Sequence, residues 1–358
     1  MIDSKGYVYS LKMRDIQKEL KFFLYDFYDF AVANEIKAGR AGILSEPIRL
    51  INCLSIEPNI LKNGFLDIGC NVGQFSLVAA AYGYNVYAFD ADRTNIDQLN
   101  KSASINGFQI NSYCGLVGPS TEEDKQFLAA GPCGNIYGIP FDTYLQDSKQ
   151  SSVSQFCIDD WWVGNNKPKL DIIKMDIEGA EFMALDGMNH ILSESAPPVY
   201  IEYNYAYTVY NGRTFADFKN YFAEYGYSPY LIKRKDVLYE ITENDFYSCH
   251  ESGDYLFIHK NSSILKSKLI IPYPVRHIKD FADYAIQCTE ARFQIGFAIE
   301  LLNNIESLYG TTLLVQFYNA LSLKKHEMSK MPLTDQEDAL INNILARIKE
   351  KIHGNLLG

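Results

Sequence analysis

The chain has 358 residues, of which 47% are hydrophobic and 22% are charged, and its formal net charge is −11. This is a globular composition, and its acidic balance disfavours nucleic acid and anionic lipid as partners, because both require a basic surface. Seven scattered cysteines without a C-x-x-C pair argue against a zinc site or a disulfide framework. With no signal-peptide pattern and no membrane-length apolar run, the sequence predicts a cytoplasmic protein without a membrane span.

The first part of the chain is predicted to be helical over about residues 10–55. Apolar residues recur there at helical spacing with charges between them: Leu20, Phe23, Leu24, Phe27 and Phe30. We therefore assign residues 1–60 to an N-terminal helical segment, which could pack on the core or cover a ligand, with packing as the default interpretation.

From Gly64 onward the pattern alternates between apolar strands and amphipathic helices. We expect strands at about 65–70, 86–90, 110–117, 170–177 and 198–202, and helices at about 72–82, 94–106, 180–192 and 214–225. Thr94 is a candidate N-cap of the second of these helices. This alternation predicts an α/β fold with a doubly wound, mostly parallel sheet. The apolar runs at 230–233 and 255–259 lack a helical crossover, which predicts an antiparallel pair at the end of the sheet.

Two regions depart from this alternation. Residues of about 119–169 contain a Gly-Pro-Cys-Gly sequence and a serine-rich stretch, which predicts a surface insertion with a hairpin or loops. From about residue 261 the chain is predicted to be helical, with an apolar stripe formed by Ile295, Ile299, Leu302 and Ile305. We therefore expect three parts, at 1–60, 61–260 and 261–358, and favour a homodimer joined through the C-terminal helices.

A glycine turn follows the first strand of the alternating region, in the sequence from Leu66 to Gly73. Gly69 and Gly73 would allow a ligand to approach the backbone closely, at the edge of the sheet where α/β proteins bind ligands. Asn71 replaces the second glycine of the dinucleotide motif and the third glycine is missing, which disfavours NAD. Asp67 could meet the ammonium of a ligand with an amino-acid end, directly or through water, while backbone N–H groups meet its carboxylate.

The second strand ends at Asp90, about 20 residues after the glycine turn. An acidic residue at this position can accept hydrogen bonds from ribose hydroxyls. The alternative is a solvated acid or a helix N-cap, a role that suits Asp92 better than Asp90. The turn and the acid together predict a cofactor that carries a nucleoside.

A third group of polar residues lies at the end of the central strand 170–177. Lys174 and Asp176 share a face of this strand, and burying them requires pairing or a ligand. Glu178 and Glu181 could instead favour a helix N-terminus. Glu202 ends the next strand and is predicted to open into the same crevice, although it could be an ordinary strand-end acid.

These motifs, in this order, resemble the FkbM family of methyltransferases. The resemblance covers about residues 64–204 and comprises the turn 67–73, Phe89-Asp90, Asn106-Gly107, Ile158-Asp159-Asp160 and the block Lys174-Met-Asp-Ile-Glu-Gly-Ala-Glu181. It departs from the family where Asp90-Ala91 replaces the usual Glu-Pro and where Cys70 replaces a small alanine. The resemblance implies a class I methyltransferase (Rossmann-like) fold and S-adenosylmethionine as the cofactor, bound by Asp67, Gly69, Asn71, Gly73 and Asp90.

By the same resemblance, the expected reaction is O-methylation of a hydroxyl on a sugar, glycan or natural product. Asp176 is the first candidate for the general base and Glu202 the second, with Lys174 holding Asp176 ionised or orienting the acceptor. The acidic cluster could instead hold a divalent cation, although we assign no metal ligand. The alternative function is a catalytically inactive, methyltransferase-like module for binding or assembly.

Overall fold

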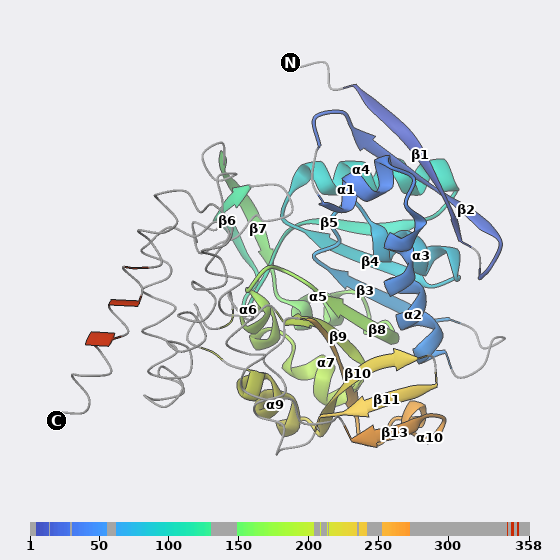
Figure 1. Cartoon of the computed structure of the whole chain (residues 1–358). Helices are drawn as coiled ribbons and strands as arrows, with labels where there is room; N and C mark the ends of the chain where they lie inside the picture. The colour runs from blue at the N-terminus through green and yellow to red at the C-terminus, as the bar shows by residue number, and fades with distance from the viewer. Residues whose placement is uncertain are drawn as a thin grey trace.

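The structure is a computed structural model. It describes residues 5–13, 15–28, 31–55, 62–129, 149–203, 215–234, 236–241 and 253–272, and the single positions 208, 213, 342, 345, 346, 349 and 350. Among these residues, one large sheet forms the centre of the molecule (Figure 1). Its strands have the order β13-β11-β10-β12-β9-β8-β3-β4-β5-β7-β6. Their bounds are β3 Gly64–Ile68, β4 Asn85–Asp90, β5 Ile110–Val117, β6 Glu122–Ala129, β7 Lys149–Phe156, β8 Leu170–Met175, β9 Val199–Tyr203, β10 Tyr227–Arg234, β11 Val237–Glu240, β12 Gly253–His259 and β13 Leu269–Pro272.

The middle of the sheet is parallel, as the alternating pattern predicts. Strand β3 pairs in parallel with β4 on one side and β8 on the other, and β8 pairs in parallel with β9. The strands that follow β3 in the chain, β4 and β5, are added on one side of it, and the later strands β8 and β9 are added on the other side. The strand order therefore reverses at β3, and the end of β3 lies beside this switch point. The expected antiparallel pair at the end is confirmed, because β10 and β12 pair antiparallel.

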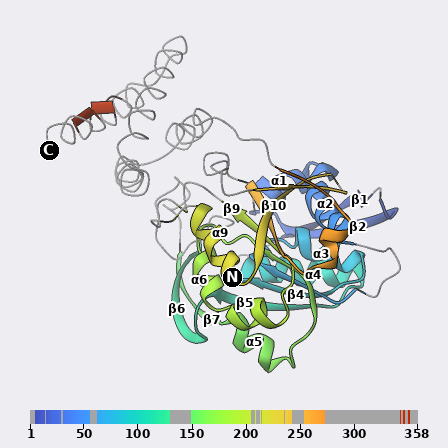
Figure 2. The same cartoon turned by 90° about the horizontal axis from the view of Figure 1, so that it is seen from below.

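Helices cover both faces of the sheet, and the apolar core is divided between these faces. The described helices are α1 Ala31–Lys37, η1 Ala41–Leu44, α2 Ser45–Leu54, α3 Gln74–Ala81, α4 Arg93–Asn106, α5 Ile158–Gly164, α6 Glu181–Asp186, α7 Asn189–Glu194, α9 Phe215–Glu224 and α10 Ser263–Lys266. Helices α2, α3 and α4 lie toward one side of the sheet, and α5, α6, α7 and α9 lie toward the other (Figures 1 and 2). Alternate side chains of β3 serve the two cores, since Phe65 belongs to one cluster and Leu66 to the other.

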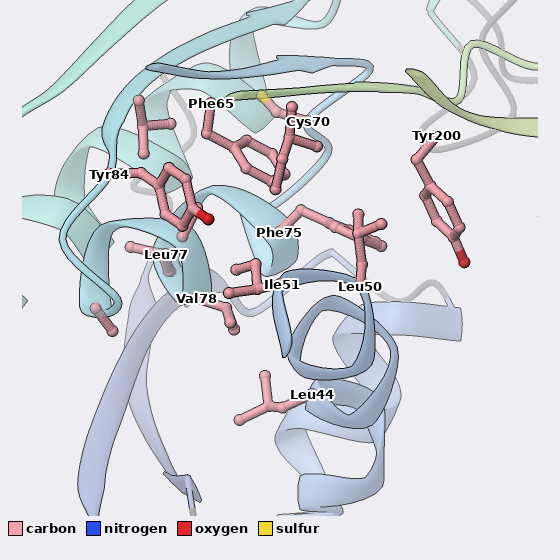
Figure 3. Close-up of a cluster of buried hydrophobic side chains, with 14 of the residues drawn as sticks. Leu44, Leu50, Ile51, Phe65, Cys70, Phe75, Leu77, Val78, Tyr84 and Tyr200 are labelled. Atoms are coloured by element: carbon pink, nitrogen blue, oxygen red, sulfur yellow. The ribbon is translucent and has the colours of Figure 1, made fainter. Parts of the chain in front are cut away.

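The core beside α2 and α3 forms one wall of the site described below. Figure 3 shows Leu50 and Ile51 of α2 on the side of Leu77 and Val78 of α3, with Phe65 of the sheet above them in this view. All five side chains are fully buried. Burial of this kind stabilises by about 1.5–3 kcal/mol for each large apolar side chain, so the start of α3 is held rigidly against the sheet.

The predicted helix over residues 10–25 is wrong. The chain there forms an antiparallel hairpin of β1 Gly6–Met13 and β2 Lys18–Tyr25, which packs on α4. Leu20, Phe22 and Leu24 are fully buried, whereas Phe27 is 61% exposed. Burial of every second residue is the pattern of a strand with one buried face. The sequence suggested a helix because the continuous apolar run Phe22-Phe23-Leu24 is also compatible with a helical period. Helices begin only at Ala31.

Several boundaries also differ from the prediction. The helix expected at 180–192 is two helices, α6 and α7, separated at Gly187. The N-cap of α4 is Asp92 and not Thr94, because the Asp92 carboxylate accepts the Thr94 N–H at 2.7 Å. The insertion at 119–169 contains the expected hairpin, β6 and β7. However, β7 also pairs in parallel with β5, so the hairpin extends the main sheet.

The C-terminal region was predicted to be helical from residue 261. Only α10 is helical in its first part, since residues 269–272 form β13, which pairs in parallel with β11. The apolar stripe at 295–305 lies outside the described residues, and the dimer expected from it stays a prediction.

Candidate active site

The turn between β3 and α3 depends on its two glycines for reasons of packing. Gly69 has φ of +77°, and a β-carbon there would lie 1.8 Å from the backbone oxygen of Asp176. Gly73 has φ of +92°, and a β-carbon would lie 2.4 Å from Leu99. Both positions therefore exclude a side chain, and the close approach at Gly69 joins the turn directly to the end of β8.

Asn71 and Asp90 form the side of the turn that faces β4. Asn71 has a left-handed backbone with φ of +48°, and its side-chain oxygen accepts the Val72 N–H at 2.8 Å. Its own N–H donates to Asp90 Oδ2 at 2.8 Å. The Asp90 carboxylate thus fixes the peptide at the tip of the turn, and the structure brings together the two residues that the sequence spacing paired.

Two further donors hold Asp90 in place. Its Oδ1 accepts the Asp92 N–H at 2.8 Å and the Asn95 side-chain amide at 3.1 Å. Burial raises the pKa of Asp90 to about 6, although these hydrogen bonds oppose the shift by stabilising the charged form. Asp90 is therefore mainly ionised at neutral pH.

Asp67 lies beneath the turn and not on its surface. The side chain has no exposed surface, and its oxygens face Ser76 Oγ at 2.6 Å and Lys174 Nζ at 3.4 Å. A bond from Asp67 to a ligand, directly or through water, stays a prediction. Asp67 connects the turn to β8 through Lys174.

Lys174 links the turn to the candidate base. Its Nζ donates to the Gly69 carbonyl at 2.7 Å and lies 3.5 Å from Asp176 Oδ2. Burial alone would lower the pKa of Lys174, but Asp176 and Asp67 outweigh it and raise the pKa above its usual value. The predicted shared face of Lys174 and Asp176 is confirmed, and the lysine carries its charge between two carboxylates.

Glu202 lies beside Asp176 at the end of β9. Oxygen atoms of Asp176, Glu178 and Glu202 all lie within 4.8 Å of one another. Burial, followed by the charges of Asp176 and Glu178, raises the pKa of Glu202 well above its usual value. We infer that Glu202 holds a proton at neutral pH, whereas the ammonium of Lys174 faces Asp176.

A cavity of about 310 Å³ opens in front of these groups. Its lining includes Lys174, Asp176 and Glu202, and also Glu46 of α2, Tyr200 of β9 and Asp254 of β12. The Tyr200 hydroxyl donates to Glu46 Oε1 at 2.9 Å. Burial, followed by the charge and hydrogen bond of Glu46, raises the pKa of Asp254 to about 8. The cavity therefore contains a second pair of neighbouring carboxyl groups, of which Asp254 holds a proton at neutral pH.

The sequence interpretation missed Glu46, Tyr200 and Asp254. Tyr200 could have been found by strand alternation, because it is two residues before Glu202 on the same face. Asp254 lies opposite Glu202 in the antiparallel pairing of β9 with β12, a register that one sequence does not reveal. Glu46 arrives from a helix far away in the chain.

Glu181 lies in the first turn of α6, which agrees with the alternative interpretation that it favours a helix N-terminus. It is 4% exposed, and its Oε1 accepts the N–H groups of Ile177 and Gly179 at 3.1 and 3.2 Å. Burial raises the pKa of Glu181 to about 7. The side chain closes the loop between β8 and α6, which includes the left-handed residue Glu178.

Residues 67–229 match the family model of the Methyltransferase FkbM domain. The chain contains an FkbM methyltransferase domain. The matched region begins at Asp67 and ends inside β10. The resemblance stated from the motifs is thus confirmed, as is the class I methyltransferase fold that it implies.

Curated relatives match shorter stretches of the chain. Ribosomal protein L11 methyltransferase of Helicobacter hepaticus is 33% identical over 85 residues, which are 24% of this chain and 26% of that protein. Ubiquinone biosynthesis O-methyltransferase of Rickettsia felis is 40% identical over 81 residues, or 21% and 33% of the two chains. The chain therefore spans about a quarter to a third of the length of these relatives.

Among solved structures, methyltransferase FkbM from Methylobacillus flagellatus is similar with 20% identity and a TM-score of 0.35, over 55% of this chain and 44% of that one. The 16S rRNA N2 G1207 methyltransferase of T. thermophilus has 13% identity and a TM-score of 0.37, over 73% and 52%. In the part of the chain that the structure describes, no helix is long and apolar enough for a membrane crossing.

Proposed function

We propose that the chain is an S-adenosylmethionine-dependent methyltransferase that methylates a hydroxyl group, on a sugar, glycan or natural product. The observation that carries this proposal is the turn of the FkbM domain, whose tip is bonded to Asp90 and whose base is joined through Lys174 to Asp176. A nucleoside site and a candidate base are thus two ends of one rigid unit.

The residues present fit the cofactor on its ribose side. Asp90 ends β4, is ionised at neutral pH, and uses three acceptor positions for Asn71, Asp92 and Asn95. A carboxylate offers about four such positions, so Asp90 retains capacity for a ribose hydroxyl. Gly69, Asn71 and Gly73 shape the adjacent turn, and Asp67 supports it from below. When bound, the cofactor supplies a methyl group already activated by a sulfonium charge.

The cavity supports a neutral acceptor that is rich in hydroxyl groups. Four carboxyl groups, those of Glu46, Asp176, Glu202 and Asp254, line it, while Lys174 already faces two carboxylates. Carboxyl oxygens accept hydrogen bonds from hydroxyls and repel anions. Its volume of about 310 Å³ is at the small end of the roughly 300–1,000 Å³ of ligand pockets, which suits a single sugar-sized group.

Asp176 is best placed to accept the proton that the acceptor hydroxyl loses. Its side chain is 40% exposed and lines the cavity, and Lys174 Nζ lies 3.5 Å from its Oδ2. Glu202, which retains a proton, can donate a hydrogen bond to Asp176 or to the acceptor and is the second candidate. Alignment of the acceptor oxygen with the methyl group would supply the larger share of the rate, within the roughly 7–11 kcal/mol of well-oriented reactions.

Asp176, Glu178 and Glu202 also offer the oxygen ligands that a divalent cation prefers. A role for a cation stays a prediction with a simple test. If the base is Asp176 alone, turnover after dialysis against EDTA should equal turnover before it. A loss that Mg²⁺ or Ca²⁺ restores would assign the cluster to a metal.

Calorimetry with S-adenosylhomocysteine tests the proposal itself. We expect micromolar binding by the wild type and a loss of at least about tenfold for Asp90→Ala, because hydrogen bonds to a charged group contribute about 1.5–3 kcal/mol. Acceptors can then be found by screening neutral and acidic sugars for release of S-adenosylhomocysteine. Absence of binding by the wild type would favour the inactive binding module.

A further inference from the structure

We propose that Tyr28 is a positioning residue of the cofactor site, and that the N-terminal hairpin thereby completes the ribose-binding part of the FkbM domain. Tyr28 lies 39 residues before Asp67, where the domain match begins. The inference rests on the proposed function, because it assigns to Tyr28 a role in binding the same cofactor. It concerns the side chain that holds Asp90 and its neighbours, not a group that touches the methyl donor.

Tyr28 lies three residues after the end of β2 and is placed in the core by the hairpin. The residue is 3% exposed, and its carbonyl accepts a hydrogen bond from Lys37 of α1 at 2.6 Å. Its hydroxyl lies 2.5 Å from Asn95 Oδ1 and 3.2 Å from Asn71 Oδ1. One phenol therefore contacts both amides that border Asp90, one on the glycine turn and one on α4.

The hydroxyl is a fixed hydrogen-bond donor. Burial raises the pKa of Tyr28 far above its usual value, and the charges of Asp90 and Asp92 act in the same direction. A hydroxyl that stays protonated, between two amide oxygens, has its single proton to give to one of them. The shorter distance favours Asn95 Oδ1 as the acceptor.

This bond sets the orientation of the Asn95 amide. With Oδ1 facing Tyr28, Nδ2 faces Asp90 and donates to its Oδ1 at 3.1 Å. Asn95 is 2% exposed, so water does not replace a lost partner. Without the phenol hydroxyl, the Asn95 amide oxygen would be buried without this donor, and the free-energy cost would be about that of desolvating a polar group. The Asp90 carboxylate, which is proposed to bind the ribose, would then be held less firmly.

The test compares Tyr28→Phe with a matched change on the same hairpin. Tyr25→Phe removes a hydroxyl that bonds Asp97 and Lys101 of α4 instead of Asn95. Binding of S-adenosylhomocysteine and of its 2′,3′-dideoxyribose analogue is measured by calorimetry on the full chain, with circular dichroism to verify the fold. We expect Tyr28→Phe to weaken S-adenosylhomocysteine binding about fivefold or more, to leave the dideoxy analogue nearly unchanged, and Tyr25→Phe to change neither.

A second variant keeps the inference open to test if Tyr28→Phe is unstable. Asn95→Ala removes the acceptor of the same bond while Tyr28 stays in place, and it should also weaken S-adenosylhomocysteine binding with little effect on the dideoxy analogue. Equal affinity of Tyr28→Phe and the wild type would overturn the inference, as would equal weakening of both ligands. If the wild type itself failed to bind S-adenosylhomocysteine, the proposed function would fall instead, so the two failures are distinguishable.

Discussion

The acidic groups of the site differ in whether a cation faces them. The ammonium of Lys174 faces Asp67 and Asp176 and is 5% exposed. Glu202, without such a partner among the described residues, retains its proton, as does Asp254, because burial raises the pKa of both carboxyl groups. One cavity thus contains a carboxyl group beside a buried cation and two protonated hydrogen-bond donors.

Asp176→Asn should lower turnover by about 10²–10⁴-fold, the usual contribution of a general base, with little effect on S-adenosylhomocysteine affinity. The amide keeps the size of the side chain and removes its charge. Steady-state kinetics with an acceptor found by screening, together with calorimetry, measures both quantities.

Asp171→Asn is the matched control, because Asp171 lies at the opposite end of β8 and bonds Asn63. We expect it to reduce stability and leave turnover unchanged. If Asp176→Asn turned over at the normal rate, Asp176 would not be the base and Glu202 would be tested next.

Cofactor affinity should fall as pH is lowered through about 6. The pKa of Asp90 is raised to about 6, so the carboxylate that accepts a ribose hydroxyl is lost below that value. At pH 5 the ionised fraction is about one tenth, and affinity should fall about tenfold relative to pH 7. Calorimetry of S-adenosylhomocysteine across this range should show the decline in the wild type and none in Asp90→Asn. An equal decline in both would place the titrating group elsewhere.

At the scale of elements, the turn between β3 and α3 is limited by the strand beside it. Gly69→Ala should lower the free energy of unfolding by at least about 3 kcal/mol, because the new β-carbon would overlap a backbone oxygen that cannot move without disturbing β8. Gly83→Ala is the control, since Gly83 also has positive φ, of +89°, but open space around it. Its cost should be that of the left-handed backbone alone, roughly 1–2 kcal/mol. Urea denaturation compares the two, and similar costs would show that the turn adapts.

The sequence predicted the parallel centre of the sheet because each strand there is a continuous apolar run that ends in a polar or glycine motif. Asp90, Lys174 and Asp176 were predicted for the same reason, since their places follow from the ends of those strands. Tyr28, Glu46 and Asp254 were not predicted. Each reaches the site through contacts between distant parts of the chain, namely the hairpin on α4, α2 beside the sheet, and the pairing of β12 with β9.

The hairpin shows a second limit of sequence patterns. Residues 18–25 satisfy a period of two through Leu20, Phe22 and Leu24, while additional aromatic residues on the other face also satisfy a helical period. What decides between them is the surface of α4, which accepts one flat apolar face. A helical assignment followed from periodicity alone, without this partner.

At the scale of the whole molecule, several buried acids share one direction of pKa shift. The pKa values of Asp90, Glu181 and Asp254 are raised to about 6, 7 and 8. The folded chain therefore binds more protons than the unfolded chain between about pH 4 and 8, so its stability falls as pH rises through this window. We expect the free energy of unfolding in urea to be lower at pH 8 than at pH 6, by about 1 kcal/mol or more.

Glu181→Gln should make this difference smaller, because it removes one of the titrating groups while keeping hydrogen-bond acceptors for Ile177 and Gly179. Stability that rose between pH 6 and 8 in the wild type would contradict the assignment of raised pKa values to these groups.

The place of β12 has a consequence for how the chain can be divided. The domain match ends at residue 229, yet β12 lies between β9 and β10, and both neighbours of β10 come later in the chain. A fragment cut at that boundary would leave β9 as an open edge, with backbone N–H and C=O groups ready to pair with another chain. It would also lose Asp254 from the cavity. A soluble minimal fragment must therefore extend at least through His259, and at its other end must include the hairpin that covers α4.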